Sequence, residues 1–163
     1  MSRTSTVKTN AVRLLESAGL VFATHEYPVD DGRIDARSIA EKLGRSTDEV
    51  FKTLVAESPA HEHFVFVIPA AGELDLKKAA QAAGRKSIEM IPQKTLLPLT
   101  GYVHGGCSPV GMKKFFPTFI DETAQLFDYI CVSAGAVGAN VAVSPDALCR
   151  FLPASYADLA VFK

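Results

Sequence analysis

Long apolar stretches are missing from this sequence. None of its 163 residues belongs to a run near the roughly 18 apolar residues that a membrane-spanning helix needs. The N-terminal segment MSRTSTVKTN also lacks the apolar core of a secretory signal. We therefore expect a cytoplasmic protein without a membrane partner.

Cysteine is scarce, and its spacing forms no recognisable pair. Cys107, Cys131 and Cys149 are odd in number and widely separated, and no CxxC motif occurs. Disulfide frameworks and structural zinc sites depend on paired thiols at characteristic spacings. The pattern argues against both, and we expect no metal and no organic cofactor.

A strong net charge is also absent, since the sequence carries only −1 at neutral pH, which argues against a dedicated nucleic-acid binder. The charges are nevertheless unevenly spread. Residues 77–114 carry seven basic side chains and one acidic one, whereas residues 1–76 carry eight and twelve. The middle third could bind phosphates, or its lysines could simply be solvated on helix surfaces. The seven basic residues are Lys77, Lys78, Arg85, Lys86, Lys94, Lys113 and Lys114.

The length fits a single domain over residues 1–163, with enough apolar residues for a core. Thr6 or Thr9 is placed to cap a first helix that ends at Ala18, with Val12, Leu14 and Leu15 facing inward. Helices and strands mix without strict alternation, so we predict an α/β (α+β) protein with a mixed central sheet flanked by helices. Further helices are predicted over 36–43, 75–83, 92–97 and 145–151, and strands over 22–27, 51–56, 63–68, 88–90, 119–121, 129–133 and 140–143.

The segment from Gly101 to Lys114, GYVHGGCSPVGMKK, contains four glycines and a proline. Glycine and proline at this density exclude a helix or a strand, so the segment is predicted to be a shaped loop. Gly105 and Gly106 could take positive φ and turn their amides toward a ligand, as anion-binding loops do.

The glycine loop continues as FFPTFIDET, and the sequence also contains HEY at 25–27, AEKLG at 40–44, VFKTL at 50–54 and VSAG at 132–135. Together these motifs resemble the YbaK/EbsC family of aminoacyl-tRNA deacylases. The resemblance implies the fold of the editing domain of prolyl-tRNA synthetases, with a mixed sheet or partial barrel. It also implies hydrolysis of an amino acid wrongly esterified to tRNA, typically cysteine on tRNA for proline.

The resemblance also implies which residues form the site. Lys52 matches the essential lysine of the family, Tyr27 a pocket wall and Ser133 a residue beside the amino acid of the substrate. With Gly105, Gly106 and Asn140 these are the expected catalytic residues. Ser108, Pro109, Gly135, Lys113 and Lys114 are the expected substrate-binding residues, and the 3′ acceptor end of an aminoacyl-tRNA is the expected partner.

Two positions leave alternatives open. Cys107 lies three residues after His104, so a thiol–imidazole pair is conceivable, yet the family is thought to use the thiol of the substrate instead. Asn140 stands where the family has an aspartate, and an amide cannot pair with a substrate ammonium as a carboxylate does. Because of this difference from the family, two alternative functions stay open: a deacylase for alanine or proline, or a non-catalytic module that binds tRNA or a synthetase. A prolyl-tRNA synthetase partner is plausible, and the oligomeric state is left open.

Overall fold

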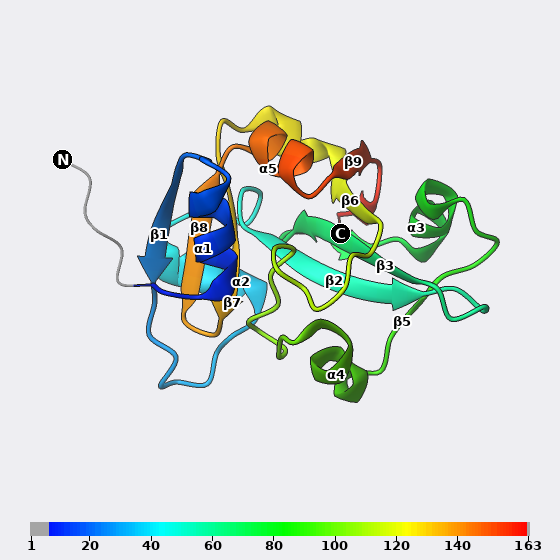
Figure 1. The fold of residues 1–163 in the computed structure, drawn as a ribbon, viewed down its shortest axis with the longest axis horizontal. Helices are drawn as coiled ribbons and strands as arrows, with labels where there is room; N and C mark the ends of the chain where they lie inside the picture. The colour runs from blue at the N-terminus through cyan, green and yellow to red at the C-terminus, as the bar shows by residue number, and fades with distance from the viewer. Residues whose placement is uncertain (1–6, 163) are drawn as a thin grey trace.

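A five-stranded mixed sheet dominates the computed structural model, which describes residues 7–162 (Figure 1). Its strand order is β5-β2-β3-β6-β9. β3 (His63–Pro69) is central, as its nearly continuous apolar sequence predicts; it pairs antiparallel with β2 (Phe51–Glu57) and parallel with β6 (Thr118–Asp121). β5 (Glu89–Met90) and β9 (Ala154–Ala157) form the two edges.

A smaller antiparallel sheet packs beside the first one. Its order is β1-β8-β7, with β1 (Phe22–Glu26), β8 (Ala139–Val143) and β7 (Ile130–Ala136). A parallel bridge between Val50 and Cys131 joins the two sheets, and the Cys131 amide donates to the Glu49 carbonyl oxygen at 2.9 Å. A third pair, β4 (Glu73–Leu74) with β10 (Ala160–Val161), completes the strands. The mixed α/β fold is as predicted.

The helices begin where short polar side chains cap them. Thr9 accepts a hydrogen bond from the Val12 amide at the start of α1 (Asn10–Ser17), and Asp35 does the same for α2 (Ala36–Leu43). α3 (Leu76–Ala83) begins at Asp75, and α5 (Pro145–Phe151) begins at Ser144. Each cap satisfies an amide that has no partner inside its helix. The alternative cap Thr6 lies outside the described residues.

Two expectations about helices are wrong in detail. Leu14 is 38 % exposed, whereas Ala11, Val12 and Leu15 are buried. At about 100° per residue, Leu14 lies on nearly the opposite side of the helix from Val12, so the two cannot both face the core. The helix expected over 92–97 is a 3₁₀ turn (Gln93–Thr95) followed by α4 (Leu96–Thr100). Pro98 is tolerated in α4 because amides of the first helical turn have no intrahelical partner.

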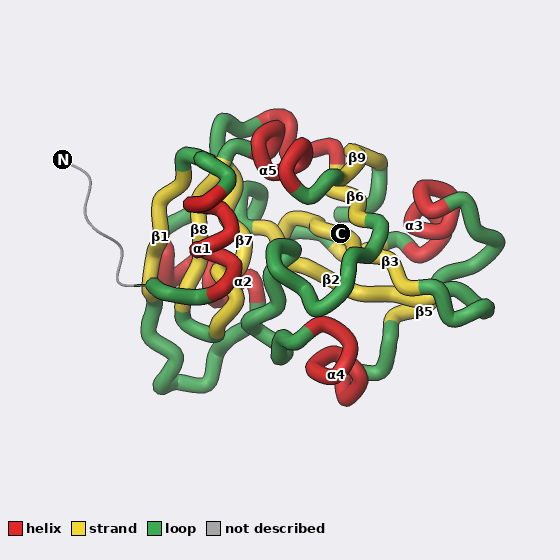
Figure 2. Tube along the Cα trace, in the orientation of Figure 1, coloured by secondary structure: helices red, strands yellow, loops and turns green. Residues whose placement is uncertain are grey.

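The segment between α4 and β6 is a long irregular loop that crosses in front of β2 (Figure 2). It contains the glycine-rich sequence and, as predicted, almost no regular structure. Over residues 7–162, no helix has the length and apolar character needed to cross a membrane.

Candidate active site

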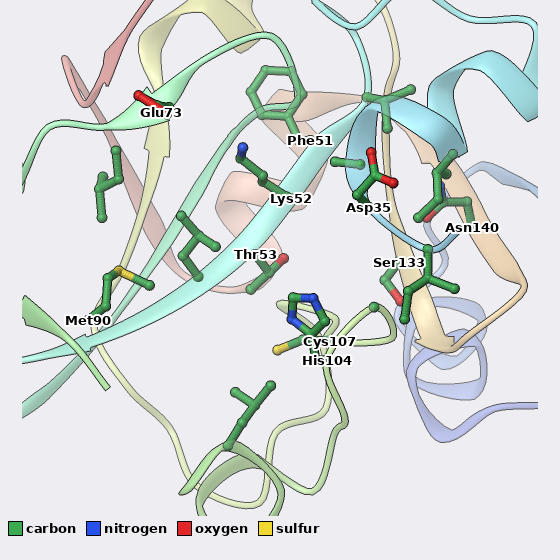
Figure 3. Close-up of a pocket in the computed structure, with 18 of the residues that line it drawn as sticks. Asp35, Phe51, Lys52, Thr53, Glu73, Met90, His104, Cys107, Ser133 and Asn140 are labelled. Atoms are coloured by element: carbon green, nitrogen blue, oxygen red, sulfur yellow. The ribbon is translucent and has the colours of Figure 1, made fainter. Parts of the chain in front are cut away.

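A cavity of about 540 Å³ lies where the two sheets meet (Figure 3). It exists because β2 has an uncovered edge there: β5 pairs only with Ala56 and Glu57, so no strand of the described chain covers residues 51–54 on that side. Side chains from both faces of a strand can reach a cavity at its edge. Accordingly, residues 51–54 all contribute to the lining.

Lys52 is the only lysine or arginine among the described residues that line this cavity. Burial lowers the pKa of its ammonium and the nearby Arg37 lowers it further, whereas the carboxylates of Glu73 and Asp35 act in the opposite direction. In Figure 3 the ammonium lies between those two carboxylates. The arrangement places a partly desolvated cation inside a mostly apolar cavity.

Tyr27, Ser133 and Asn140 reach the cavity from one face of the smaller sheet. Ser133 lies opposite Asn140 in the β7–β8 pair, and Asn140 lies opposite His25 in the β8–β1 pair. Side chains that are opposite each other in antiparallel strands share a face. Tyr27 continues that face two residues beyond His25, which itself does not line the cavity. The structure thus brings three of the predicted residues together with Lys52.

The glycine-rich loop contributes Gly105 to the cavity, but Gly106 does not line it. Gly105 has φ +87°, and a Cβ there would lie 2.6 Å from Cδ1 of Ile34, so only glycine fits. The expectation that Gly106 takes positive φ and offers its amide to a ligand is wrong, because this amide donates to the Val103 carbonyl oxygen at 3.0 Å. A Cβ on Gly106 would lie 2.9 Å from the Val137 nitrogen, so Gly106 instead lets the loop contact the β7–β8 turn.

Five further residues expected to bind substrate do not line the cavity. The buried Ser108 hydroxyl accepts a hydrogen bond from the Val110 amide at 3.1 Å, which shapes the loop. The Lys113 ammonium donates to the Pro98 carbonyl oxygen at 3.3 Å on the surface. Contact of these residues with substrate therefore stays a prediction. The five are Ser108, Pro109, Gly135, Lys113 and Lys114.

Cys107 and His104 both line the cavity, but they do not form an activated pair. Burial raises the pKa of the Cys107 thiol to about 12, and a hydrogen bond with Thr100 offsets this only in part. No hydrogen bond between Cys107 and His104 occurs within the described part of the chain. At neutral pH the thiol is protonated and therefore a poor nucleophile.

Sequence reasoning missed three polar residues of the lining: Asp35, Thr53 and Glu73. Asp35 directly precedes a predicted helix, which signals a capping role but not a place in a cavity. Thr53 alternates with Lys52 along β2, and only the uncovered edge of β2 brings both to the same cavity. The Thr53 hydroxyl oxygen is buried, and no side chain or backbone group of the described chain hydrogen bonds to it. No cluster of three or more histidine, cysteine, aspartate or glutamate side chains in residues 7–162 could hold a metal ion.

The fold of this chain is shared with two solved structures. One is described as "hypothetical protein APE2540" and superposes with a TM-score of 0.84 at 23 % identity, covering 92 % of this chain and 98 % of its own. The other, described as "a putative trans-editing enzyme for prolyl tRNA synthetase", gives a TM-score of 0.80 at 24 % identity, covering 95 % and 99 %. The chain therefore has the same fold as these two structures.

Sequence comparison identifies the family. Residues 33–151 match the model of the aminoacyl-tRNA editing domain. The chain is also 41 % identical over 152 residues to "Putative Cys-tRNA(Pro)/Cys-tRNA(Cys) deacylase EbsC" of Enterococcus faecalis, covering 93 % of each protein. The chain belongs to the YbaK/EbsC family of aminoacyl-tRNA editing domains, and it is an aminoacyl-tRNA editing deacylase, a hydrolase.

Proposed function

We propose that this protein hydrolyses misacylated tRNA, chiefly cysteine esterified to tRNA for proline, and that the thiol of the substrate performs the attack. The observation that carries the proposal is the cavity itself: it holds one ammonium, from Lys52, and a protein thiol whose pKa is about 12. The names of the E. faecalis relative and of the similar editing structure support this substrate class. Editing is needed because a synthetase pocket cannot strongly reject a slightly smaller amino acid.

In the proposed reaction, the thiolate sulfur of the cysteinyl group attacks its own ester carbonyl carbon. The bond between this carbon and the ribose oxygen breaks, and the ribose oxygen leaves with the electron pair and takes up a proton. The products are a cyclic thioester, which water opens, and a tRNA with a free 3′-terminal ribose. Lys52 stabilises the negative charge that develops on the oxygens, while Tyr27 and Ser133 shape the pocket around the amino acid.

The partner in this proposal is the 3′ acceptor end of the tRNA, which must enter the cavity beside the uncovered edge of β2. Terminal adenosine and phosphates then lie outside the cavity, near the surface lysines that follow the glycine-rich loop. A prolyl-tRNA synthetase is proposed as a second partner, because an editing protein that acts in trans must capture the product after its release.

A deacylation assay over tRNAs charged with cysteine, alanine, proline and serine tests the proposal. We expect the cysteinyl ester to be hydrolysed fastest, and Lys52→Ala to lower its rate at least a hundredfold while the protein stays folded. Faster hydrolysis of the alanyl or prolyl ester would assign a different substrate. A Lys52→Ala variant with the wild-type rate would contradict the site.

A further inference from the structure

We propose that Asp35 binds the free α-ammonium group of the aminoacyl ester and thereby makes the site selective for an unblocked amino acid. The inference rests on the proposed deacylation and adds a specificity-determining residue to it. The substrate brings a second ammonium into a cavity in which Lys52 already lies between the carboxylates of Glu73 and Asp35. Like charges repel each other in a partly desolvated cavity, and an anion near both of them offsets this repulsion. Glu73 lies on the far side of Lys52 from Asn140 in Figure 3, whereas Asp35 lies on the same side as Asn140.

Asp35 is positioned to supply that anion. It lines the cavity, and Figure 3 shows its carboxylate between the Lys52 side chain and Asn140. Its attraction opposes part of the lowering of the Lys52 pKa that burial causes, so the two groups interact electrostatically. Asn140 also lines the cavity, but its neutral amide can offer an ammonium only the lone pairs of its oxygen and carries no charge to offset a second ammonium.

The Asp35 carboxylate is held in place and kept ionised. The Ser38 amide donates to Oδ2 at 3.0 Å, and the Ser38 hydroxyl donates to Oδ1 at 2.6 Å. These bonds lower the pKa of Asp35, so it remains an anion at neutral pH. The Arg33 guanidinium in turn donates to the buried Ser38 hydroxyl at 3.3 Å. The carboxylate therefore does not need to reorient before a ligand arrives.

These capping bonds leave room for a ligand. A carboxylate has about four acceptor positions on its two oxygens, and Ser38 occupies two of them. An ammonium has three donors, so it can bind one remaining position of Asp35 and the Asn140 amide oxygen together. This geometry selects a free amino group, because an N-acylated amino acid carries neither the charge nor the donors.

The test compares cysteinyl-tRNA with N-acetyl-cysteinyl-tRNA in single-turnover assays. Asp35→Asn removes the charge but keeps a good helix cap, so α2 should still form. We expect about a tenfold lower rate on the free aminoacyl ester and an unchanged rate on the N-acetylated ester, because charge-assisted hydrogen bonds are roughly twice as strong as neutral ones. Asp48→Asn makes the same chemical change at an exposed residue that does not line the cavity, and it should alter neither rate.

A second variant tests whether a carboxylate at this side of the cavity suffices. Combining Asp35→Asn with Asn140→Asp returns one anion to the cavity and should restore the preference for the free amino group. An equal loss on both esters would mean that Asp35 acts through Lys52 or the helix, and would overturn the inference. Unchanged rates in Asp35→Asn would also overturn it. If the wild-type protein hydrolysed no aminoacyl ester at all, the proposed function would fail together with the inference.

Discussion

Cys107 can distinguish attack by the thiol of the substrate from attack by a thiol of the protein, because its surroundings keep its own thiol protonated. Its pKa of about 12 results from burial beside the cavity, so a negligible fraction is thiolate at neutral pH. We expect Cys107→Ala to hydrolyse cysteinyl-tRNA within about threefold of the wild-type rate, since a small buried side chain is replaced by a smaller one. Seryl-tRNA should be a poor substrate for both proteins, because a hydroxyl is far less nucleophilic than a thiol.

Mass spectrometry of the reaction mixture provides the decisive control for this prediction. If the substrate sulfur attacks, no acyl group becomes attached to the protein. An inactive Cys107→Ala variant, or a thioester found on the tryptic peptide containing Cys107, would establish a protein nucleophile instead.

The ammonium of Lys52 should give the activity a characteristic pH dependence. Its pKa lies below the ordinary lysine value, chiefly because of burial and then because of repulsion from Arg37. The charged form is therefore lost at a lower pH than in an exposed lysine, and activity that depends on it must fall on the alkaline side. Arg37→Gln removes the repulsion, raises the pKa of Lys52, and should move this alkaline limb to higher pH.

Single-turnover rates across pH, corrected for spontaneous ester hydrolysis, measure this shift. Arg13→Gln, on the exposed face of α1, removes the same charge away from the cavity and should leave the profile in place. If the alkaline fall in activity occurred at the same pH in Arg37→Gln as in the wild type, a group other than Lys52 would be responsible for it.

Asp121 connects the end of β6 to the C-terminal segment of the chain through hydrogen bonds. Only 2 % of this residue is exposed, and its Oδ1 accepts hydrogen bonds from the Leu159 and Ala160 amides, both at 2.9 Å. Its Oδ2 also caps the following 3₁₀ turn through Thr123. We expect Asp121→Ala to lower the free energy of unfolding by about 3 kcal/mol, because two buried amides lose a charged acceptor.

Urea unfolding followed by circular dichroism measures the loss. Asp158→Ala is the matched control. Asp158 directly precedes Leu159 in the sequence, but its side chain is largely exposed and pairs with Lys78 on the surface. It should change stability too little to resolve. If both variants lost a similar amount of unfolding free energy, the hydrogen bonds of Asp121 would not have the stabilising role that we assign to them.

Most elements could be predicted from the sequence because their signals are local. Capping residues and terminal glycines located the helices, and the apolar run His63–Ile68 located the central strand. β4, β9 and β10 were missed because Glu73–Leu74, Ala154–Ala157 and Ala160–Val161 are short and have no clear alternation. β9 exists through parallel pairing with β6, a contact between distant residues that no local pattern encodes.

The candidate site was predictable only as far as motifs reach. Family motifs indicated Lys52, Tyr27 and Ser133, and the structure brings them to one cavity. Asp35 and Thr53 could not be found in this way, because their place in the cavity depends on where α2 packs and where β5 stops covering β2. Gly106 was misjudged because glycine content does not reveal whether the amide is already bonded within the loop.

For the whole molecule, the basic middle third of the sequence is not one uniform surface. Lys78 pairs with Asp158, and Arg85 pairs with Glu62, so these two charges on or just after α3 are partly neutralised. Lys113 and Lys114 instead follow the glycine-rich loop, and Lys113 is anchored on α4, which contributes Leu96 to the cavity lining. α3 and α4 lie apart in Figure 1. The lysines near α4 are therefore the better candidates for binding the phosphates of an acceptor stem whose end is in the cavity.

Charge reversal at this pair tests that placement. We expect Lys113→Glu combined with Lys114→Glu to weaken binding of aminoacyl-tRNA and to reduce the slope of log K against log salt by about 1.5, because each phosphate contact releases roughly one counterion. The melting temperature should not change, since both side chains are exposed.

The control is Arg13→Glu combined with Arg150→Glu, which alters the net charge by the same amount on α1 and α5. Neither helix lines the cavity, so this double variant should leave most of the salt dependence intact. Binding titrations at several salt concentrations measure both slopes. If the two double variants lost the same slope, tRNA would be responding to net charge alone, and the lysines beside α4 would have no particular role in binding.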